Sequence, residues 1–205
     1  MIGIIDYGSG NVSAIMNLLK RQKIDHILTN DVAELRSADR FLLPGVGAFD
    51  PTIKHLKASG IVDVLKDEVH GKGKPILGIC VGMHLLAEGS DEGGEGGLGW
   101  VPGRVTRIDP ATFKTTPHLP HMGWNSLHLT GSDPLFEGID TERGFYFLHS
   151  YYFKVASDEN VMAQVQYGAH LPCAVKNGSV YGVQFHPEKS HSNGMRLFQN
   201  FAELS

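Results

Sequence analysis

Short hydrophobic runs and amphipathic stretches alternate along the first half of the chain. The apolar runs, which are typical of strands buried on both faces of a parallel sheet, lie at residues 1–5, 24–29, 41–43 and 75–79. Between them, hydrophobic positions recur at helical spacing over residues 12–23, 31–36, 51–58 and 61–70. Strands that alternate with helices through short connections predict a doubly wound α/β sheet with right-handed crossovers.

The pattern changes after residue 89. A glycine-rich, acidic stretch over residues 89–99 predicts a loop. Strand-like runs follow at residues 100–108, 121–129, 145–155, 161–167, 173–176 and 179–185. Asn177-Gly178 favours a hairpin turn between the last two, and an amphipathic helix closes the chain from about residue 194. We therefore expect one α/β domain over residues 1–205, whose mostly parallel sheet is extended by antiparallel strands in the C-terminal half.

The composition excludes several classes of protein. Of the 205 residues, 41% are hydrophobic and 20% are charged, which is typical of a globular domain. The formal net charge of −4 gives no basic footprint for nucleic acid or an anionic membrane surface. The sequence has no apolar run near the roughly 20 residues of a membrane span, and no signal sequence precedes the first strand. With two cysteines, Cys80 and Cys173, we expect a cytoplasmic protein in which Cys173 is a small core residue.

The strand predicted at residues 75–79 leads into Gly78-Ile-Cys-Val-Gly82. This segment has the G-x-nucleophile-x-G pattern of a nucleophile elbow, with cysteine in place of serine. Small residues let the backbone turn tightly and push the nucleophile out of the strand end. A helix that begins just after Cys80 favours a thiolate, because its first N–H groups are unpaired and carry the positive end of the helix dipole. A buried structural cysteine between two glycines is the alternative.

A second motif contains the acid–base groups that a thiol nucleophile requires. His186 and Glu188 end the predicted strand at residues 179–185, and in extended backbone residues two apart point the same way. Pro187 between them fixes the local geometry. A histidine oriented by a carboxylate is the arrangement used in nucleophilic thiol catalysis. In isolation, a surface His-Pro-Glu turn is an equal alternative, but the cysteine elbow favours catalysis.

An oxyanion site is predicted at the loop Pro44-Gly-Val-Gly47, at the carboxyl end of a neighbouring predicted strand. Sheets of this class bind their ligands at that end. Backbone N–H groups of Gly45, Val46 and Gly47 can approach a developing oxyanion there, alongside the N–H of Val81 after the nucleophile. A plain turn can have the same loop pattern. The prediction of an oxyanion site therefore depends on the position of this loop beside the elbow.

Over essentially its whole length the chain resembles the class I, triad-type glutamine amidotransferases. Within that class it is most similar to the HisH-type glutaminase subunits of imidazole glycerol phosphate synthase. The wider class shares the cysteine elbow and the His-Pro-Glu motif. The other marks are Asp6-Tyr-Gly-Ser-Gly-Asn11, Leu43-Pro-Gly-Val-Gly-Ala-Phe49, Pro120-His-Met-Gly-Trp-Asn125, His149-Ser-Tyr151 and the lysine of Glu188-Lys189.

The resemblance implies a flavodoxin-like fold and the hydrolysis of L-glutamine through a thioester on Cys80, without a cofactor or metal ion. His186 would move the proton, and Glu188 would orient the imidazole. Ammonia would pass to a HisF-type (β/α)₈-barrel cyclase, with which such subunits form a heterodimer in histidine biosynthesis.

The resemblance also assigns residues to the substrate and to the partner. Glutamine contacts are implied for His84, Glu92, Ser150 and Tyr151. Partner contacts are implied for Asn11, Trp124, Tyr146 and Lys189. One position departs from the family, which usually has glutamine where this chain has His84. A neutral histidine can donate or accept one hydrogen bond per nitrogen, so it can substitute.

Other interpretations of these residues remain open. A cysteine peptidase, or the glutaminase of another synthase such as pyridoxal phosphate synthase, could use the same elbow, and an inactive scaffold could keep the fold. Residues 8–13 half-match a dinucleotide-binding loop, but serine replaces its third glycine. His118 and His121 have the spacing of zinc ligands without a nearby cysteine or helix to complete a site. We therefore predict a glutaminase without a metal ion.

Overall fold

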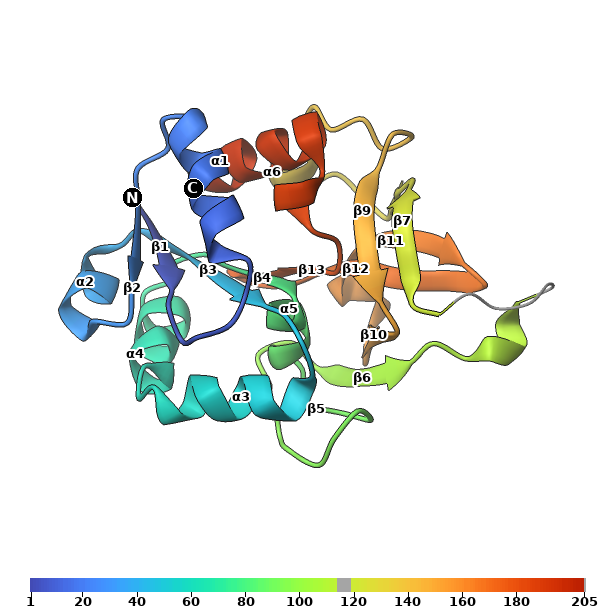
Figure 1. Ribbon diagram of the computed structural model, residues 1–205, viewed down its shortest axis with the longest axis horizontal. Coiled ribbons are helices and arrows are strands. Elements are labelled where there is room, and N and C mark those ends of the chain that lie inside the picture. Colours follow the sequence, from blue (N-terminus) through green and yellow to red (C-terminus); the bar gives the residue numbers. More distant parts are fainter. Residues whose placement is uncertain (114–118, 205) are drawn as a thin grey trace.

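The computed structural model describes residues 1–113 and 119–204. Its centre is an eight-stranded sheet with the strand order β2-β1-β3-β4-β13-β12-β11-β8 (Figure 1). The first five strands of this order run parallel to one another. They are β2 (His26–Thr29), β1 (Ile2–Ile5), β3 (Arg40–Gly45), β4 (Ile76–Cys80) and β13 (Val180–Val183). The mostly parallel α/β sheet predicted from the hydrophobic pattern is confirmed.

Helices cover both faces of the parallel strands (Figure 1). One face carries α1 (Val12–Arg21) and α6 (His191–Glu203), and the other carries α3 (Phe49–Ala58), α4 (Val62–Lys66) and α5 (Val81–Leu85). Helix α6 begins three residues before the predicted start. Among the helices of the described ranges, none is long and apolar enough to cross a bilayer.

Antiparallel strands extend the sheet beyond β13, as predicted. They are β12 (Ala169–Asn177), β11 (Val161–Tyr167) and the short β8 (His128–Leu129). Strands β12 and β13 form the hairpin that Asn177-Gly178 favours, with Asn177 paired to Val180. The antiparallel half of the sheet therefore holds β13, and the residues that follow it, in place beside β4.

Two predicted strands are each divided between sheets. The run over residues 121–129 forms β7 (His121–Asn125) before it reaches β8. The run over residues 145–155 divides at Ser150 into β9 (Phe145–His149) and β10 (Tyr151–Val155). Strand β9 pairs with β7, and β10 joins a small sheet with β6 (Gly103–Arg107) and β5 (Gly89–Ser90). A continuous hydrophobic run does not reveal where a strand changes its partner, so these small sheets were not predicted.

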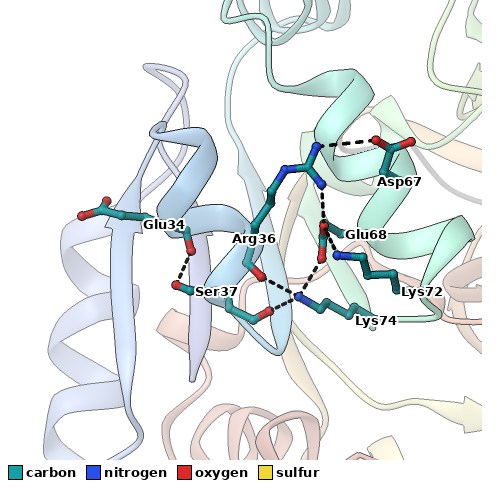
Figure 2. A network of polar contacts seen from close by, with 8 residues as sticks. Glu34, Arg36, Ser37, Asp67, Glu68, Lys72 and Lys74 are labelled. Carbon is teal, nitrogen blue, oxygen red and sulfur yellow. Dashed lines mark hydrogen bonds and ion pairs between the residues drawn. The ribbon is translucent and has the colours of Figure 1, made fainter.

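A buried carboxylate organises the segment that leads into β4 (Figure 2). Glu68 lies in a π-helical turn after α4, and its side chain is fully buried. It forms ion pairs with Lys72 and Lys74, both at 2.7 Å, and with Arg36 of α2 (Val32–Ser37) at 3.0 Å. The hydrogen bonds from both lysines outweigh burial and lower the pKa of Glu68 to about 2. This network fixes α2 against the turn from which the nucleophile strand starts.

Candidate active site

Cys80 occupies the sharp turn between β4 and α5. Its backbone has a φ of 55° and a ψ of −113°, which residues other than glycine rarely adopt. The flanking glycines permit the turn: a Cβ on Gly82 would lie 1.8 Å from the carbonyl oxygen of Leu43, and one on Gly78 would lie 2.6 Å from that of Gly82. The turn therefore has the backbone geometry of a nucleophile elbow, and its thiol faces a cavity beyond the strand end.

His186 approaches this thiol from the end of β13. Phe185 stacks on Phe145 in the core, with ring centroids 3.9 Å apart, which anchors the segment. The His186 ring bonds through Nδ1 to Oε1 of Glu188, at 2.9 Å, and also forms a hydrogen bond with Cys80. Burial opposes a charge on the ring, but these two partners outweigh burial and raise the pKa of His186 to about 10. The ring of His186 is therefore protonated at neutral pH.

The cavity in front of Cys80 has a volume of about 360 Å³, the size of a small-molecule site. Segments from six parts of the chain form its walls: the β3–α3 loop, the elbow, the loop around residue 92, Pro120, the junction of β9 with β10 and the segment that follows β13. The residues predicted for the oxyanion and for glutamine that line it are Val46, Gly47, Val81, His84, Glu92, Ser150 and Tyr151. The structure thus brings together predicted residues that lie up to 105 positions apart.

Gly45 and Val46 depart in detail from a simple oxyanion loop. Gly45 still belongs to β3, where it pairs with Cys80, and a Cβ on it would lie 2.4 Å from the backbone nitrogen of Gly82. Gly45 therefore permits a close approach of the strand to the elbow. The N–H of Val46 donates to Oγ of Ser9 at 3.1 Å, and the Ser9 hydroxyl lies 3.2 Å from the Val46 carbonyl oxygen, to which it donates. In this conformation Ser9 holds both polar groups of Val46.

Two polar features of the cavity wall are fixed by backbone contacts. Oε2 of Glu92 accepts a hydrogen bond of 2.9 Å from the N–H of Phe49, at the start of α3. The carbonyl of Tyr151 accepts one of 2.8 Å from Nδ1 of His149. The carboxylate and the Ser150–Tyr151 backbone are therefore held at the wall before any ligand binds.

Two buried histidines, His149 in the cavity wall and His121 next to it, were not predicted as site residues. Nδ1 of His121 and Nε2 of His149 lie 2.9 Å apart. Because the Tyr151 carbonyl can only accept, Nδ1 of His149 carries the hydrogen, its Nε2 accepts, and His121 donates. Burial lowers the pKa of His149 to about 3 and that of His121 to about 4, so both rings are neutral at neutral pH. The sequence signal that could have identified His149 was its position two residues before Tyr151, which begins the next strand.

Gln184 is the third site residue that the sequence interpretation did not include. It is fully buried, two residues before His186. Its Nε2 lies 3.9 Å from Sγ of Cys80, and its Oε1 lies 2.7 Å from Nε2 of His84. Burial lowers the pKa of His84 to about 4, although the bond to Gln184 opposes this effect. The two-residue period of a strand was the signal that could have placed Gln184 on the face of His186.

The residues assigned to a partner lie near this site. Trp124 of β7 is 43% exposed. Nζ of Lys189 lies 5.5 Å from the centroid of the Tyr146 ring. Nδ2 of Asn11 donates to Oε1 of Glu188 at 3.4 Å, so this side chain directly contacts the carboxylate that holds the His186 ring.

Metal chemistry finds no support in the described parts of the chain, where no three His, Cys, Asp or Glu side chains are arranged to hold an ion. His118 of the zinc-like pair lies outside the described residues. His121 of that pair bonds to His149 and stacks on Tyr167, with ring centroids 3.9 Å apart. The groups gathered at the cavity are instead those of nucleophilic thiol chemistry.

Several known proteins are similar to this chain in sequence or in fold. The profile of the family "Glutamine amidotransferase class-I" matches residues 3–204. The chain is 47% identical to the imidazole glycerol phosphate synthase subunit HisH of Bdellovibrio bacteriovorus and 45% identical to that of Leptospira borgpetersenii, over 100% of each chain. A solved structure of a glutamine amidotransferase has a TM-score of 0.73 at 21% identity, over 98% of this chain and 97% of that one. This last likeness shows the fold alone. The chain belongs to the class-I glutamine amidotransferase family.

Proposed function

We propose that this chain is the glutaminase subunit of an imidazole glycerol phosphate synthase, folded as one catalytic domain. The observation that carries the proposal is the cavity in which the Cys80 elbow meets a His186 bonded to Glu188. The 40–47% identity to proteins named HisH supports this particular synthase. The subunit would hydrolyse L-glutamine to glutamate and ammonia, for use in histidine biosynthesis.

The first half of the reaction breaks the amide bond. The Cys80 thiolate attacks the side-chain carbonyl carbon of glutamine, and a C–S bond forms while the carbonyl electrons move to oxygen. The tetrahedral intermediate then collapses, the C–N bond breaks, and His186 gives its proton to the departing nitrogen. Ammonia leaves, and a glutamyl thioester remains on Cys80. The raised pKa of His186, to about 10, supports its role as the acid in this step.

The second half returns the site to its starting state. Neutral His186 takes a proton from water, and the resulting hydroxide attacks the thioester carbon. The C–S bond breaks, glutamate leaves, and the thiolate stands again beside a protonated His186. Glu188 holds Nδ1 of the ring throughout, so that Nε2 faces the reacting atoms.

Glutamine would be held by the wall residues. We assign its α-amino group to the carboxylate of Glu92 and its α-carboxylate to the backbone of Ser150 and Tyr151. Glu92 and this backbone both border the cavity and are already fixed by hydrogen bonds, which supports low reorganisation on binding. His84 also borders the cavity, but its Nε2 is committed to Gln184.

The oxyanion would be stabilised by the N–H groups of Val81 and of the Gly45–Gly47 loop. The bonds of Val46 to Ser9 mean that its N–H must change partner before it can serve the oxyanion. A rotation of this peptide, driven by a partner, would couple assembly to catalysis. The proposed subunit is therefore slow alone.

The partner we propose is a HisF-type (β/α)₈-barrel cyclase, in a cytoplasmic heterodimer. The exposed Trp124 and the Lys189–Tyr146 pair lie near the site and would form part of the contact. Asn11 would connect that contact to Glu188. Ammonia would pass across this interface to the cyclase.

Glutamate release tests the proposal in three conditions: the chain alone, with the cyclase, and with the cyclase and its nucleotide ligand. We expect low, intermediate and high rates, and no release by Cys80→Ala in any condition. Glutamate release that survives Cys80→Ala would remove the nucleophile assignment. Cleavage of peptides without any turnover of glutamine would replace the proposal with a peptidase.

A further inference from the structure

The elbow cysteine has a second polar neighbour besides His186. Gln184 lies at the end of β13 and His84 lies on α5, one helical turn after Cys80. Both side chains are buried. Together they form a short chain of contacts, from His84 Nε2 to Gln184 Oε1 at 2.7 Å and from Gln184 Nε2 to Cys80 Sγ at 3.9 Å.

The direction of these contacts follows from their chemistry. A carbonyl oxygen can only accept, so Nε2 of His84 carries the hydrogen and donates it to Gln184. Burial keeps the ring neutral near neutral pH, so His84 donates to Gln184 without bringing a charge into the buried site. Once Oε1 of Gln184 is held in this way, the amide cannot rotate without losing the bond, and its NH₂ group faces the sulfur. The reverse orientation would place a carbonyl oxygen against a thiolate.

We propose that Gln184 and His84 are positioning residues for Cys80: His84 fixes the Gln184 amide, and the amide directs an N–H donor at the sulfur that favours the thiolate. This inference rests on the proposed function, because it takes Cys80 as the nucleophile. It gives His84 a role different from the direct glutamine contact that the family resemblance implies.

Other ionisable groups near the sulfur do not duplicate this donor. His186 occupies the side of the sulfur from which the proton is exchanged. The Tyr7 phenol donates to the Pro44 carbonyl, and burial raises the pKa of Tyr7, so it stays neutral. Gln184 is therefore the neutral amide donor of the site.

Alkylation of Cys80 by iodoacetamide, measured from pH 5 to pH 10 without glutamine, tests the inference. Iodoacetamide reacts with the thiolate form of cysteine. The other cysteine, Cys173, is fully buried in β12, so the reaction reports on Cys80. Gln184→Met fills a similar volume without a donor, and we expect it to move the midpoint of the rate profile upward by about one pH unit, the effect of losing one hydrogen bond to a charged group. Gln199→Met, on the exposed face of α6, is the matched control and should leave the profile unchanged.

The His84 variants test whether this residue acts through Gln184. His84→Leu should shift the midpoint in the same direction, and His84→Gln, which restores a donor, should return it to the wild-type position. Adding His84→Leu to Gln184→Met should cause no further shift, because the amide that it fixes is gone. Thermal melting of each variant shows which ones fold, and if Gln184→Met does not, the two single His84 variants carry the test.

Two results would overturn the inference. One is an alkylation profile that Gln184→Met leaves unchanged. The other is a His84→Leu variant that raises KM for glutamine but leaves the alkylation profile unchanged, since that is the behaviour of a substrate contact. The alkylation profile decides both results and does not depend on turnover, so both are distinct from a failure of the proposed function, which would appear as wild-type chain that releases no glutamate with its cyclase.

Discussion

Two groups of histidines around one cavity are almost equally buried and yet differ in charge. His186, beside Cys80, is 5% exposed, whereas His84 on α5, His121 on β7 and His149 on β9 are 3%, 2% and 7% exposed. Burial disfavours the charged ring in all four. The pKa of His186 nevertheless rises to about 10, while the pKa values of the other three fall to between about 3 and 4.

The difference lies in the partners. His186 faces a carboxylate and a thiol, both of which can be anionic. The other three rings face a carbonyl, an amide oxygen or a second imidazole, none of which carries a charge. The same residue type is therefore charged in one place and neutral in the other, and the neighbouring group decides which.

Removing the charged ring should have the largest effect. His186→Ala leaves glutamine without an acid and the thiol without a base, so we expect glutaminase activity to fall by about a thousandfold or more. Glutamate release with the cyclase present measures the loss. His128→Ala, at an exposed position on β8, is the control and should retain wild-type activity. Comparable losses in both variants would show a general defect in place of a catalytic one.

Neutralising Glu188 tests whether its charge causes the difference in pKa between His186 and the other three histidines. Glu188→Gln keeps the size of the side chain but removes its charge, so the pKa of His186 should fall toward those of the neutral group. We expect a loss of activity about a hundredfold smaller than that of Cys80→Ala, because residual orientation survives. Histidine NMR follows the ring directly. A His186 that still titrates near pH 10 in this variant would show that Glu188 is not the cause.

The neutral histidines should lower the free energy of unfolding at acidic pH. The unfolded chain binds a proton at His149 below about pH 6.5, whereas the folded chain does not do so until about pH 3, so the free energy of unfolding falls as the pH drops between these values. His149→Gln should make this fall shallower by up to about 1.4 kcal/mol per pH unit. Urea titrations at several pH values measure the slope. His170→Gln, at an exposed position, should leave it unchanged.

The smallest expected effect on the glutaminase rate concerns Val46, whose backbone N–H must exchange its present partner before it can serve the oxyanion. The Ser9 hydroxyl bonds to both polar groups of the Val46 backbone, and the Thr52 hydroxyl also donates to the Val46 carbonyl, at 3.4 Å. Ser9→Ala removes about 1 kcal/mol of hydrogen-bond free energy that stabilises the present conformation of Val46. The glutaminase rate of the chain alone should therefore rise about fivefold. Ser13→Ala, an exposed serine at the start of α1, is the control. A rate that stays constant or falls would show that Ser9 does not restrain this loop.

The sequence was sufficient to predict the central sheet and the Cys–His–Glu geometry. Both depend on local patterns: apolar runs separated by helices, a nucleophile between two glycines, and a histidine and a glutamate two residues apart around a proline. The extended backbone expected over His186–Glu188 is wrong in detail: Pro187–Lys189 forms a 3₁₀ turn, and this turn leaves Nδ1 of His186 2.9 Å from Oε1 of Glu188. Strand β13 brings the pair to Cys80 because it pairs with β4. Residues such as Glu92, Ser150 and Tyr151 reached the cavity as the family resemblance implied.

What the sequence did not predict depends on contacts between distant segments. The division of residues 145–155 at Ser150 arises from a change of partner strand, which leaves no mark in the hydrophobic pattern. Gln184 and His121 look like ordinary polar strand residues until their distant partners are known. The bond between Ser9 and Val46 joins two loops 37 residues apart, and no local rule of turn chemistry implies it.

Strand β7 presents a buried face and an exposed face within five residues. His121 is buried and bonded to the cavity wall, while Met122 and Trp124 are 63% and 43% exposed on the other side of the strand. Under the proposed partner contact at Trp124, substitutions at the outward positions would change which protein the chain recognises without disturbing the imidazoles behind them. Laboratory evolution aimed at a new partner would then begin at β7.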